Sequence, residues 1–318
     1  MRIAIIWDWE NATEQTITWK DGLCAAIKSL CTRHDVKFYT IGRRQIIPHE
    51  YFPIHVVPSS DLVEDVKEFS PDTILHWADC TRPHAEPLGK LGIPMALCFA
   101  GGDTMAENWY RFAHVFVEND EYKQKFDEQE VACTVAFGTN TGLYTPIENA
   151  QRNIDVYFPA TFADWKRHDL FYKSVAGLRA MCAGYMYEER ERYCWEEPMK
   201  RGVTVVPHVS AATNRFLMAQ SKVILVTSKN IGGSQRTVLE ALAMNTPVIV
   251  MSDSIKCSEY LKGIGREDWI VDPEPAKIRE KIEQVMAQEP VDTRSALFGH
   301  WDEETYASRI EEGLKSIL

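Results

Sequence analysis

The sequence predicts an α/β protein of two domains, each built around a parallel sheet. Short β-branched runs alternate with stretches whose apolar residues recur at helical spacing, in both halves of the chain. The chain has 318 residues, which is enough for two cores of ordinary domain size. A polar stretch at residues 146–153 interrupts the alternation, and we place the domain boundary there.

The first half opens with a buried strand at residues 2–7 (RIAIIW). A helix then carries Leu23, Ile27 and Leu30 on one face, and residues 36–41 form the second strand. This order is typical of a Rossmann-like sheet, whose ligands bind beyond the carboxyl ends of the strands. The same alternation continues, with strands expected at 54–57, 73–77, 94–99 and 114–117 and helices at 62–69 and 121–126.

The second half repeats the pattern. It begins with a strand at residues 154–158 (IDVYF), followed by the polar loop PATFADWKRHD and a helix expected over residues 170–181. Further strands are expected at 203–206, 222–227 and 248–251, and helices at 216–219, 238–243, 278–286 and 306–317.

The loop before the helix at 238–243 is a candidate ligand site. Gly232, Gly233 and Ser234 lie where the free N–H groups of a helix N-terminus attract an anion. We therefore expect a phosphate-bearing ligand there, with Thr237 as a further hydroxyl and Glu240 deeper in the helix. The alternative is that the glycines only turn the chain and Glu240 is a solvated helix residue.

This stretch resembles the nucleotide-sugar loop of retaining glycosyltransferases of the family-4 type, which have the GT-B fold. Their pattern is two glutamates eight positions apart around a glycine loop, then an alanine-rich helix and a Gly-Thr-Pro-Val turn. Glu240, Ala241, Ala243 and 246–248 match, whereas Gly232 stands at the first glutamate and Asn245 at the turn glycine. The resemblance implies that Glu240 holds the donor ribose. It leaves the sugar open, because the first glutamate contacts the sugar in many members.

The loop at residues 159–169 carries a second part of the resemblance. In the family this loop has an arginine and, five positions later, a lysine, and both bind the donor diphosphate. Lys166 stands at the lysine position and Thr161 at the arginine position, and Arg167 is a candidate for the missing charge. A cation there offsets the charge that grows on the leaving diphosphate. The alternative is a solvated loop lysine.

In the first half, the family has a histidine, often followed by aspartate, that contacts the sugar. Only Asp103 matches, and an N-cap role for it is the alternative. Asn11, Lys20 and Asp79 are further polar candidates at strand ends. The resemblance implies an acceptor-side domain at 1–150, a donor domain at 151–300 and a helix at 301–318 that returns to the first domain.

Composition and motifs narrow the function classes. A formal net charge of −11 argues against a nucleic acid as the main partner. Eight scattered cysteines without a C-x-x-C pair indicate reduced thiols in a cytoplasmic protein. We expect no transmembrane segment and no signal peptide, with peripheral membrane contact left open. The sequence has no D-x-D motif, which binds a metal–diphosphate, and no Walker A motif, which is typical of nucleotide triphosphatases. It also lacks the H-E-x-x-H motif of zinc proteases and the G-x-S-x-G motif of serine hydrolases.

We therefore expect a metal-independent, retaining glycosyltransferase without a cofactor. It would move a sugar from a nucleotide-diphosphate donor to a glycan, lipid or small-molecule acceptor. Lys166, Arg167 and Asp103 are the expected catalytic residues. Three alternatives remain: a nucleotide-sugar epimerase of the same fold, a transferase acting on a modified nucleic-acid base, and a catalytically silent protein that binds a sugar nucleotide or a partner glycosyltransferase. The expected donor-binding residues are Gly232, Gly233, Ser234, Thr237 and Glu240.

Overall fold

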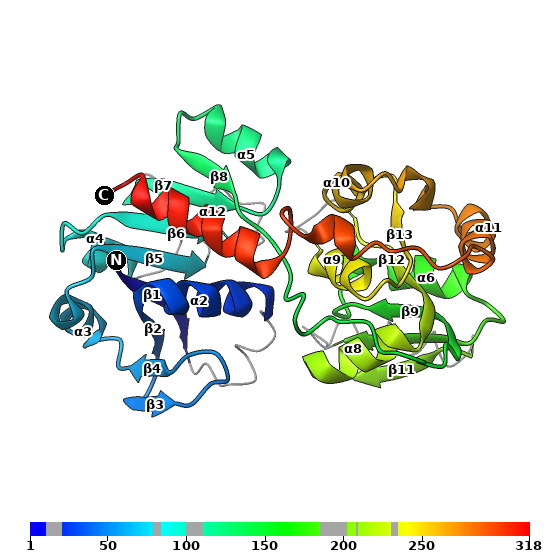
Figure 1. The fold of residues 1–318 in the computed structure, drawn as a ribbon, viewed down its shortest axis with the longest axis horizontal. Coiled ribbons are helices and arrows are strands. Elements are labelled where there is room, and N and C mark those ends of the chain that lie inside the picture. The colour runs from blue at the N-terminus through cyan, green and yellow to red at the C-terminus, as the bar shows by residue number, and fades with distance from the viewer. Residues whose placement is uncertain (11–20, 79–83, 100–110, 185–201, 208, 230–234) are drawn as a thin grey trace. The chain divides into compact units, whose positions relative to one another are not determined.

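The computed structural model of the chain divides into two compact units. It describes residues 1–10, 21–78, 84–99, 111–184, 202–207, 209–229 and 235–318. Unit 1 contains the described residues up to Asn140 and those from His300 onward, and unit 2 contains the described residues from Thr141 to Gly299. Each unit is built on one sheet with helices against it (Figure 1).

Unit 1 holds an eight-stranded sheet in the order β3-β4-β2-β1-β5-β6-β7-β8. The pairs are parallel except β3–β4, which is antiparallel. In the centre, Ile3 of β1 is in register with Val36 of β2 and Thr73 of β5. The strands are β1 (Arg2–Glu10), β2 (Asp35–Ile41), β3 (Gln45–Ile47), β4 (Ile54–Val57), β5 (Thr73–Ala78), β6 (Met95–Phe99), β7 (His114–Val117) and β8 (Cys133–Val135).

Apolar cores cover both faces of this sheet, as parallel sheets require. Alternate residues of β1 point to opposite faces, so that Ile3 and Ile5 lie in one core and Ala4 and Ile6 in the other. The first core contains residues of α2 and α12, and the second contains residues of α3, α4 and α5. The helices are α2 (Asp21–Arg33), α3 (Leu62–Phe69), α4 (Ala85–Gly89), α5 (Asp120–Asp127) and α12 (Glu303–Lys315).

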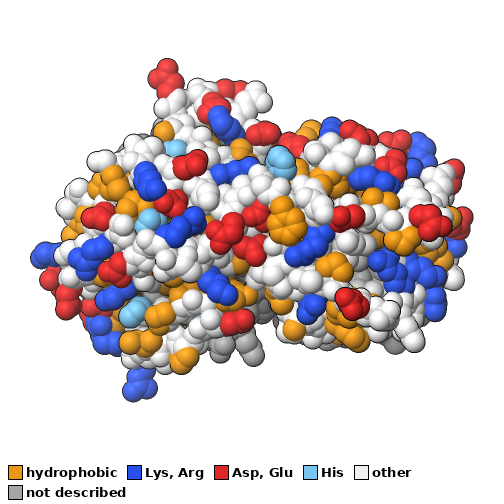
Figure 2. Space-filling view, viewed as in Figure 1, with side chains coloured by type: hydrophobic (Ala, Val, Ile, Leu, Met, Phe, Trp, Pro, Cys, Tyr) orange, Lys and Arg blue, Asp and Glu red, His pale blue; other side chains and the backbone are white. Residues whose placement is uncertain are grey.

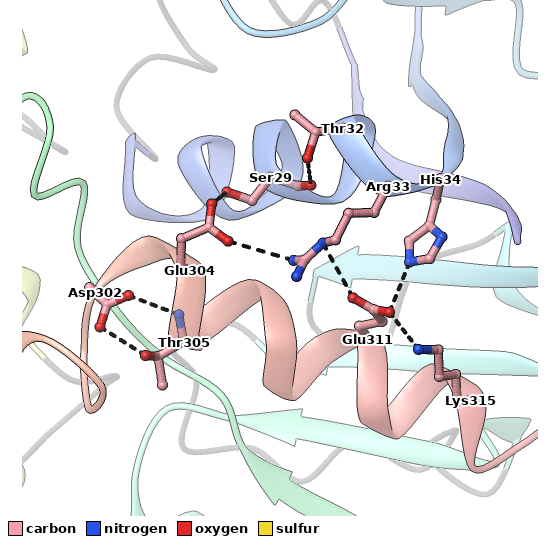
Figure 3. A network of polar contacts seen from close by, with 9 residues as sticks. All are labelled: Ser29, Thr32, Arg33, His34, Asp302, Glu304, Thr305, Glu311 and Lys315. Atoms are coloured by element: carbon pink, nitrogen blue, oxygen red, sulfur yellow. Dashed lines mark hydrogen bonds and ion pairs between the residues drawn. The ribbon is translucent and has the colours of Figure 1, made fainter.

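The C-terminal helix α12 packs beside α2 in unit 1 (Figure 1). Polar contacts reinforce the packing, because Glu311 lies 3.3 Å from both Arg33 Nε and His34 Nε2 (Figure 3). Asp302 caps the helix by accepting a 2.9 Å hydrogen bond from the backbone N–H of Thr305. The expected return of the last helix to the first domain is confirmed.

Unit 2 holds a six-stranded parallel sheet in the order β11-β10-β9-β12-β13-β14. Its strands are β9 (Ile154–Pro159), β10 (Ala180–Gly184), β11 (Thr204–Pro207), β12 (Ser221–Val226), β13 (Val248–Met251) and β14 (Ile270–Val271). Its helices are α6 (His168–Ser174), α8 (Ala211–Ala219), α9 (Arg236–Ala243), α10 (Ile255–Gly263) and α11 (Pro275–Met286), with short 3₁₀ turns η2 (Asp164–Lys166), η4 (Glu267–Trp269) and η5 (Ser295–Leu297).

The two-domain α/β fold with parallel sheets is confirmed, but the helix expected over residues 170–181 is wrong. The helix α6 ends at Ser174, and Gly177 then adopts a left-handed conformation with φ +79°. Ala180 and Met181 instead begin β10, in register with Val156 and Tyr157 of β9. A short apolar run fits a helix and a buried strand equally well, and here the sheet decides.

Three further features of the described residues are the distribution of surface charge, the character of the helices and the state of the cysteines. Basic and acidic side chains are interspersed over the face drawn in Figure 2. None of the helices in the described ranges combines the length and apolar character that a membrane span needs. The cysteines in the same ranges are free thiols.

The turn after α9 explains why an asparagine can stand where the family has a glycine. Asn245 has φ +52°, a conformation open to glycine and, at lower cost, to asparagine. Its side-chain oxygen accepts hydrogen bonds from the backbone N–H groups of Thr293 (2.9 Å) and Arg294 (2.8 Å). The side chain thus joins the end of α9 to a segment 48 residues away.

We expect Asn245→Gly to lower the free energy of unfolding by about 1 kcal/mol, because the turn survives but its side-chain acceptor is lost. Asn245→Ala should cost about 2 kcal/mol, since it adds the strain of a left-handed alanine. Urea unfolding of the two variants would test this order. Equal stability of both variants would contradict the role of backbone conformation.

Candidate functional site

Four of the expected site residues lie in described parts of unit 2: Lys166, Arg167, Thr237 and Glu240. The other expected or considered residues lie outside the described residues, and the hypotheses about them remain predictions. These are Asn11, Lys20, Asp79, Asp103, Gly232, Gly233 and Ser234.

A turn at residues 164–167 follows β9 and is fixed against the end of β12. The backbone N–H of Lys229 donates to Trp165 O at 2.8 Å, and Thr227 Oγ1 donates to Lys166 O at 2.6 Å. Both partners follow β12 within three residues, at the carboxyl edge of the sheet. Parallel sheets bind their ligands at this edge.

Lys166 lies in this turn and extends its side chain to the start of α9. Its ammonium donates a hydrogen bond to Oε1 of Gln235, the residue directly before that helix. Among the described residues, Lys166 forms no ion pair. Burial lowers its pKa to about 8. The side chain is therefore a partly desolvated cation held by a neutral amide.

Arg167 is engaged within unit 2. Its guanidinium forms a two-bond ion pair with Asp253, at 2.6 and 2.8 Å, and donates to the carbonyl oxygens of Thr227 and Ser228. Its backbone has φ 53°, so the turn bends sharply into α6. Arg167 thereby ties the turn to β12 and to the residues after β13, and its proposed contact with a diphosphate stays a prediction.

The helix α9 carries both Thr237 and Glu240. Thr237 Oγ1 lies 3.5 Å from Pro159 O, at the end of β9. The Glu240 side chain is buried, with 9% of the residue exposed. A buried carboxylate needs polar partners, because desolvation disfavours its charged form. Its role toward a ribose stays a prediction.

Asn214 of α8 supplies one such partner for Glu240. Its Nδ2 lies 3.4 Å from Glu240 Oε2, and its Oδ1 accepts a 2.9 Å hydrogen bond from the Tyr157 hydroxyl. Burial, and secondarily the charge of Glu240, raises the pKa of Tyr157. The tyrosine therefore remains a neutral hydrogen-bond donor that orients the asparagine.

Three of these residues were missed by the sequence reasoning. Gln235 directly follows the expected glycine loop, so its position offered a signal. Tyr157 offered a weaker one, as a hydroxyl within an apolar strand. Asn214 is 26 residues from Glu240 and 57 from Tyr157, and no local pattern links them.

The arrangement combines a lysine ammonium at the start of α9 with a buried carboxylate in that helix. Lys166 and the start of α9 present positive charge, and Glu240 lies in the same helix. A ligand with a phosphate group and hydroxyl donors fits this pair of groups. Among the described residues, no three or more His, Cys, Asp or Glu side chains gather in a way that could hold a metal ion.

Comparison with known proteins gives a match to a family model within unit 2 and the fold of the chain. Residues 153–288 match the family model described as glycosyl transferases group 1. No curated protein matches the sequence.

Solved structures match the chain over nearly its full length. A sucrose-phosphate synthase from Thermosynechococcus elongatus has a TM-score of 0.72 and 13% identity, covering 99% of this chain and 98% of the other. A glycosyltransferase from Rickettsia africae has a TM-score of 0.74 and 13% identity, covering 99% and 98%. The Anabaena protein HepE, in complex with UDP and glucose, has a TM-score of 0.71 and 14% identity, covering 99% and 100%.

These likenesses confirm the expected GT-B fold. The group 1 match over residues 153–288 confirms the recognition of a divergent glycosyltransferase, and with it the expected enzyme class.

Proposed function

We propose that this chain, whose residues 153–288 match the glycosyl transferases group 1 model, transfers a sugar from a nucleotide-diphosphate donor to an acceptor, with retention of anomeric configuration. The observation that carries the proposal is that the Lys166 ammonium reaches Gln235 at the start of α9, while the buried Glu240 carboxylate lies further along this helix. Thr237 lies between the two along the helix.

The spacing along α9 suits a nucleoside diphosphate. Gln235 and Glu240 are five residues apart, which corresponds to about 7.5 Å along a helix axis. A diphosphate near Lys166 therefore leaves its ribose within reach of Glu240, whose carboxylate accepts hydrogen bonds from two hydroxyls. HepE, which has the same fold, is described in complex with UDP-glucose, and this supports UDP as the first ligand to test.

The chemistry that we propose needs a stabilised leaving group. The bond between the sugar carbon and the diphosphate oxygen breaks, and the diphosphate oxygen keeps the electron pair. The acceptor oxygen forms the new bond on the same face and passes its proton to that departing oxygen. Lys166 offsets the negative charge that develops on the diphosphate. The sequence has no D-x-D motif, and this supports a reaction in which side-chain cations carry that role.

The remaining parts of the proposal concern the acceptor and the setting. We propose that unit 1 binds a glycan, lipid or small-molecule acceptor, and that the enzyme acts in the cytoplasm without a cofactor. Supplying labelled donor with candidate acceptors and determining the product anomer by NMR would test transfer and retention together. Product of inverted configuration would overturn retention while leaving glycosyl transfer intact.

We expect UDP or another nucleoside diphosphate to stabilise the protein by about 2.7 kcal/mol at a concentration one hundred times its dissociation constant. Affinity should fall as the pH rises through about 8, because Lys166 is cationic below its pKa and neutral above it. A thermal-shift screen followed by calorimetry at pH 7 and pH 9 measures both effects. Uridine is the control, since it lacks the phosphates. If no nucleoside diphosphate binds, the proposed function is wrong.

A further inference from the structure

We propose that Gln235 is a positioning residue for Lys166: its side-chain carbonyl holds the ammonium at the start of α9 and releases it to the donor diphosphate. The inference rests on the proposed function and adds to it the residue that controls the binding cation. Gln235 lies immediately before α9, and its backbone is extended, with φ −93° and ψ 97°.

The Gln235 side chain bonds to the Lys166 ammonium and does not cap α9. A residue at this position commonly caps the helix through its side chain, but Gln235 forms no such cap bond. Its Oε1 instead accepts from the Lys166 ammonium, and the Ser228 hydroxyl lies 3.5 Å from the same oxygen. An amide oxygen has two acceptor positions, and these two donors suffice to fill them.

The backbone under Lys166 is fixed, so the exchange of partners needs only side-chain motion. The carbonyl of Lys166 is bonded to Thr227, and that of Trp165 to Lys229. The lysine side chain has a flexible four-carbon stem, which can swing its ammonium while the turn stays in place. A diphosphate at the start of α9 would thus take over the cation without refolding of the turn.

The charged and titratable groups near Lys166 do not replace the Gln235 amide as the hydrogen-bond partner of its ammonium. On its own turn, Arg167 is paired with Asp253. In α6, burial lowers the pKa of His168 to about 3, so this ring is neutral, and Asp169 pairs with Lys173. From α10, burial raises the pKa of the Cys257 thiol, which is therefore neutral too. Asp164, at the start of the turn, is exposed.

A neutral amide at position 235 suits a cation that must be released. Because a glutamate at this position would be negatively charged, it would form an ion pair with Lys166 and repel the incoming diphosphate. A leucine would leave the ammonium without this acceptor and lower its pKa further. The amide holds the lysine in place without competing as an anion.

The test compares Gln235→Glu and Gln235→Leu with the wild type, using UDP as the probe. For Gln235→Glu we expect UDP affinity at pH 7 to fall roughly tenfold or more, and donor KM to rise more than kcat changes. The pKa of Lys166, followed by NMR of its labelled Nζ in the protein without UDP, should rise in Gln235→Glu and fall in Gln235→Leu. A purely structural role would not move this pKa in opposite directions.

Gln284→Glu is the matched control, because it adds the same charge to unit 2 at an exposed position of α11. Melting temperatures show whether each variant is folded. If UDP binds the wild type but Gln235→Glu changes neither the affinity nor the Lys166 pKa, this inference is wrong and the proposed function stands. If no nucleoside diphosphate binds the wild type, the proposed function fails and the inference fails with it.

Discussion

Lys166→Ala is expected to lower kcat by roughly a hundredfold or more, with little loss of stability. In the proposed reaction the ammonium already contacts the anionic diphosphate of the donor, and it stabilises the further negative charge that develops there as the sugar bond breaks, so much of the loss falls on the transition state. The position supports this role, because the side chain extends from a fixed turn to the start of α9 and is partly desolvated. Steady-state kinetics with a saturating donor would measure the change.

Lys173→Ala is the control for this variant. Lys173 lies one helix further along, in α6, and forms an exposed ion pair with Asp169 at 3.2 Å. The Lys173→Ala substitution removes a positive charge from the same region without changing the proposed site. Its turnover should therefore stay within about twofold of the wild-type value. Full activity of a folded Lys166→Ala variant would remove Lys166 from the catalytic machinery.

The sequence predicted the architecture well because parallel sheets have strong local signatures. Strands such as 222–227 and 248–251 are short β-branched runs, and both form the expected strands. The local signal fails where an element is short or ambiguous. β3 has only three residues, with Ile46 63% exposed, and β14 has two.

The helix expected over residues 170–181 failed for a related reason. The chain leaves α6 at Ser174, and the left-handed Gly177 redirects it into the sheet. One isolated glycine in an apolar stretch does not distinguish a helix interrupted by a turn from a continuous one. Pairing with β9, which is remote in the sequence, made Ala180–Gly184 a strand.

The candidate site was predictable only in part. Lys166 and Glu240 became candidates because the loop and the helix that carry them resemble the family pattern, and their roles stay predictions. The partners that adjust them are remote: Gln235 is 69 residues from Lys166, and Asn214 is 26 residues from Glu240. Asp253, which pairs with Arg167, is 86 residues away. Such contacts arise from the sheet order, which the sequence pattern alone does not determine.

Glu240→Gln is expected to weaken UDP binding by roughly a hundredfold, while changing kcat less. A hydrogen bond to a charged acceptor contributes about 1.5–3 kcal/mol, and the ribose hydroxyls are its proposed donors. The amide keeps the shape of the side chain but has one oxygen fewer to accept with. Isothermal titration calorimetry on both proteins would measure the loss directly.

The ribose itself provides the sharper test of Glu240. UDP lacking both ribose hydroxyls should bind the wild type and Glu240→Gln with nearly equal affinity, since the carboxylate then has nothing to accept from. Glu280→Gln, an exposed change on α11, controls for the lost charge and should bind UDP normally. If Glu240→Gln weakened both nucleotides equally, the residue would act through the packing of α9 or through its charge, and the ribose assignment would be wrong. Asn214, which lies between Tyr157 and Glu240, would then be part of that packing and not of the nucleotide site.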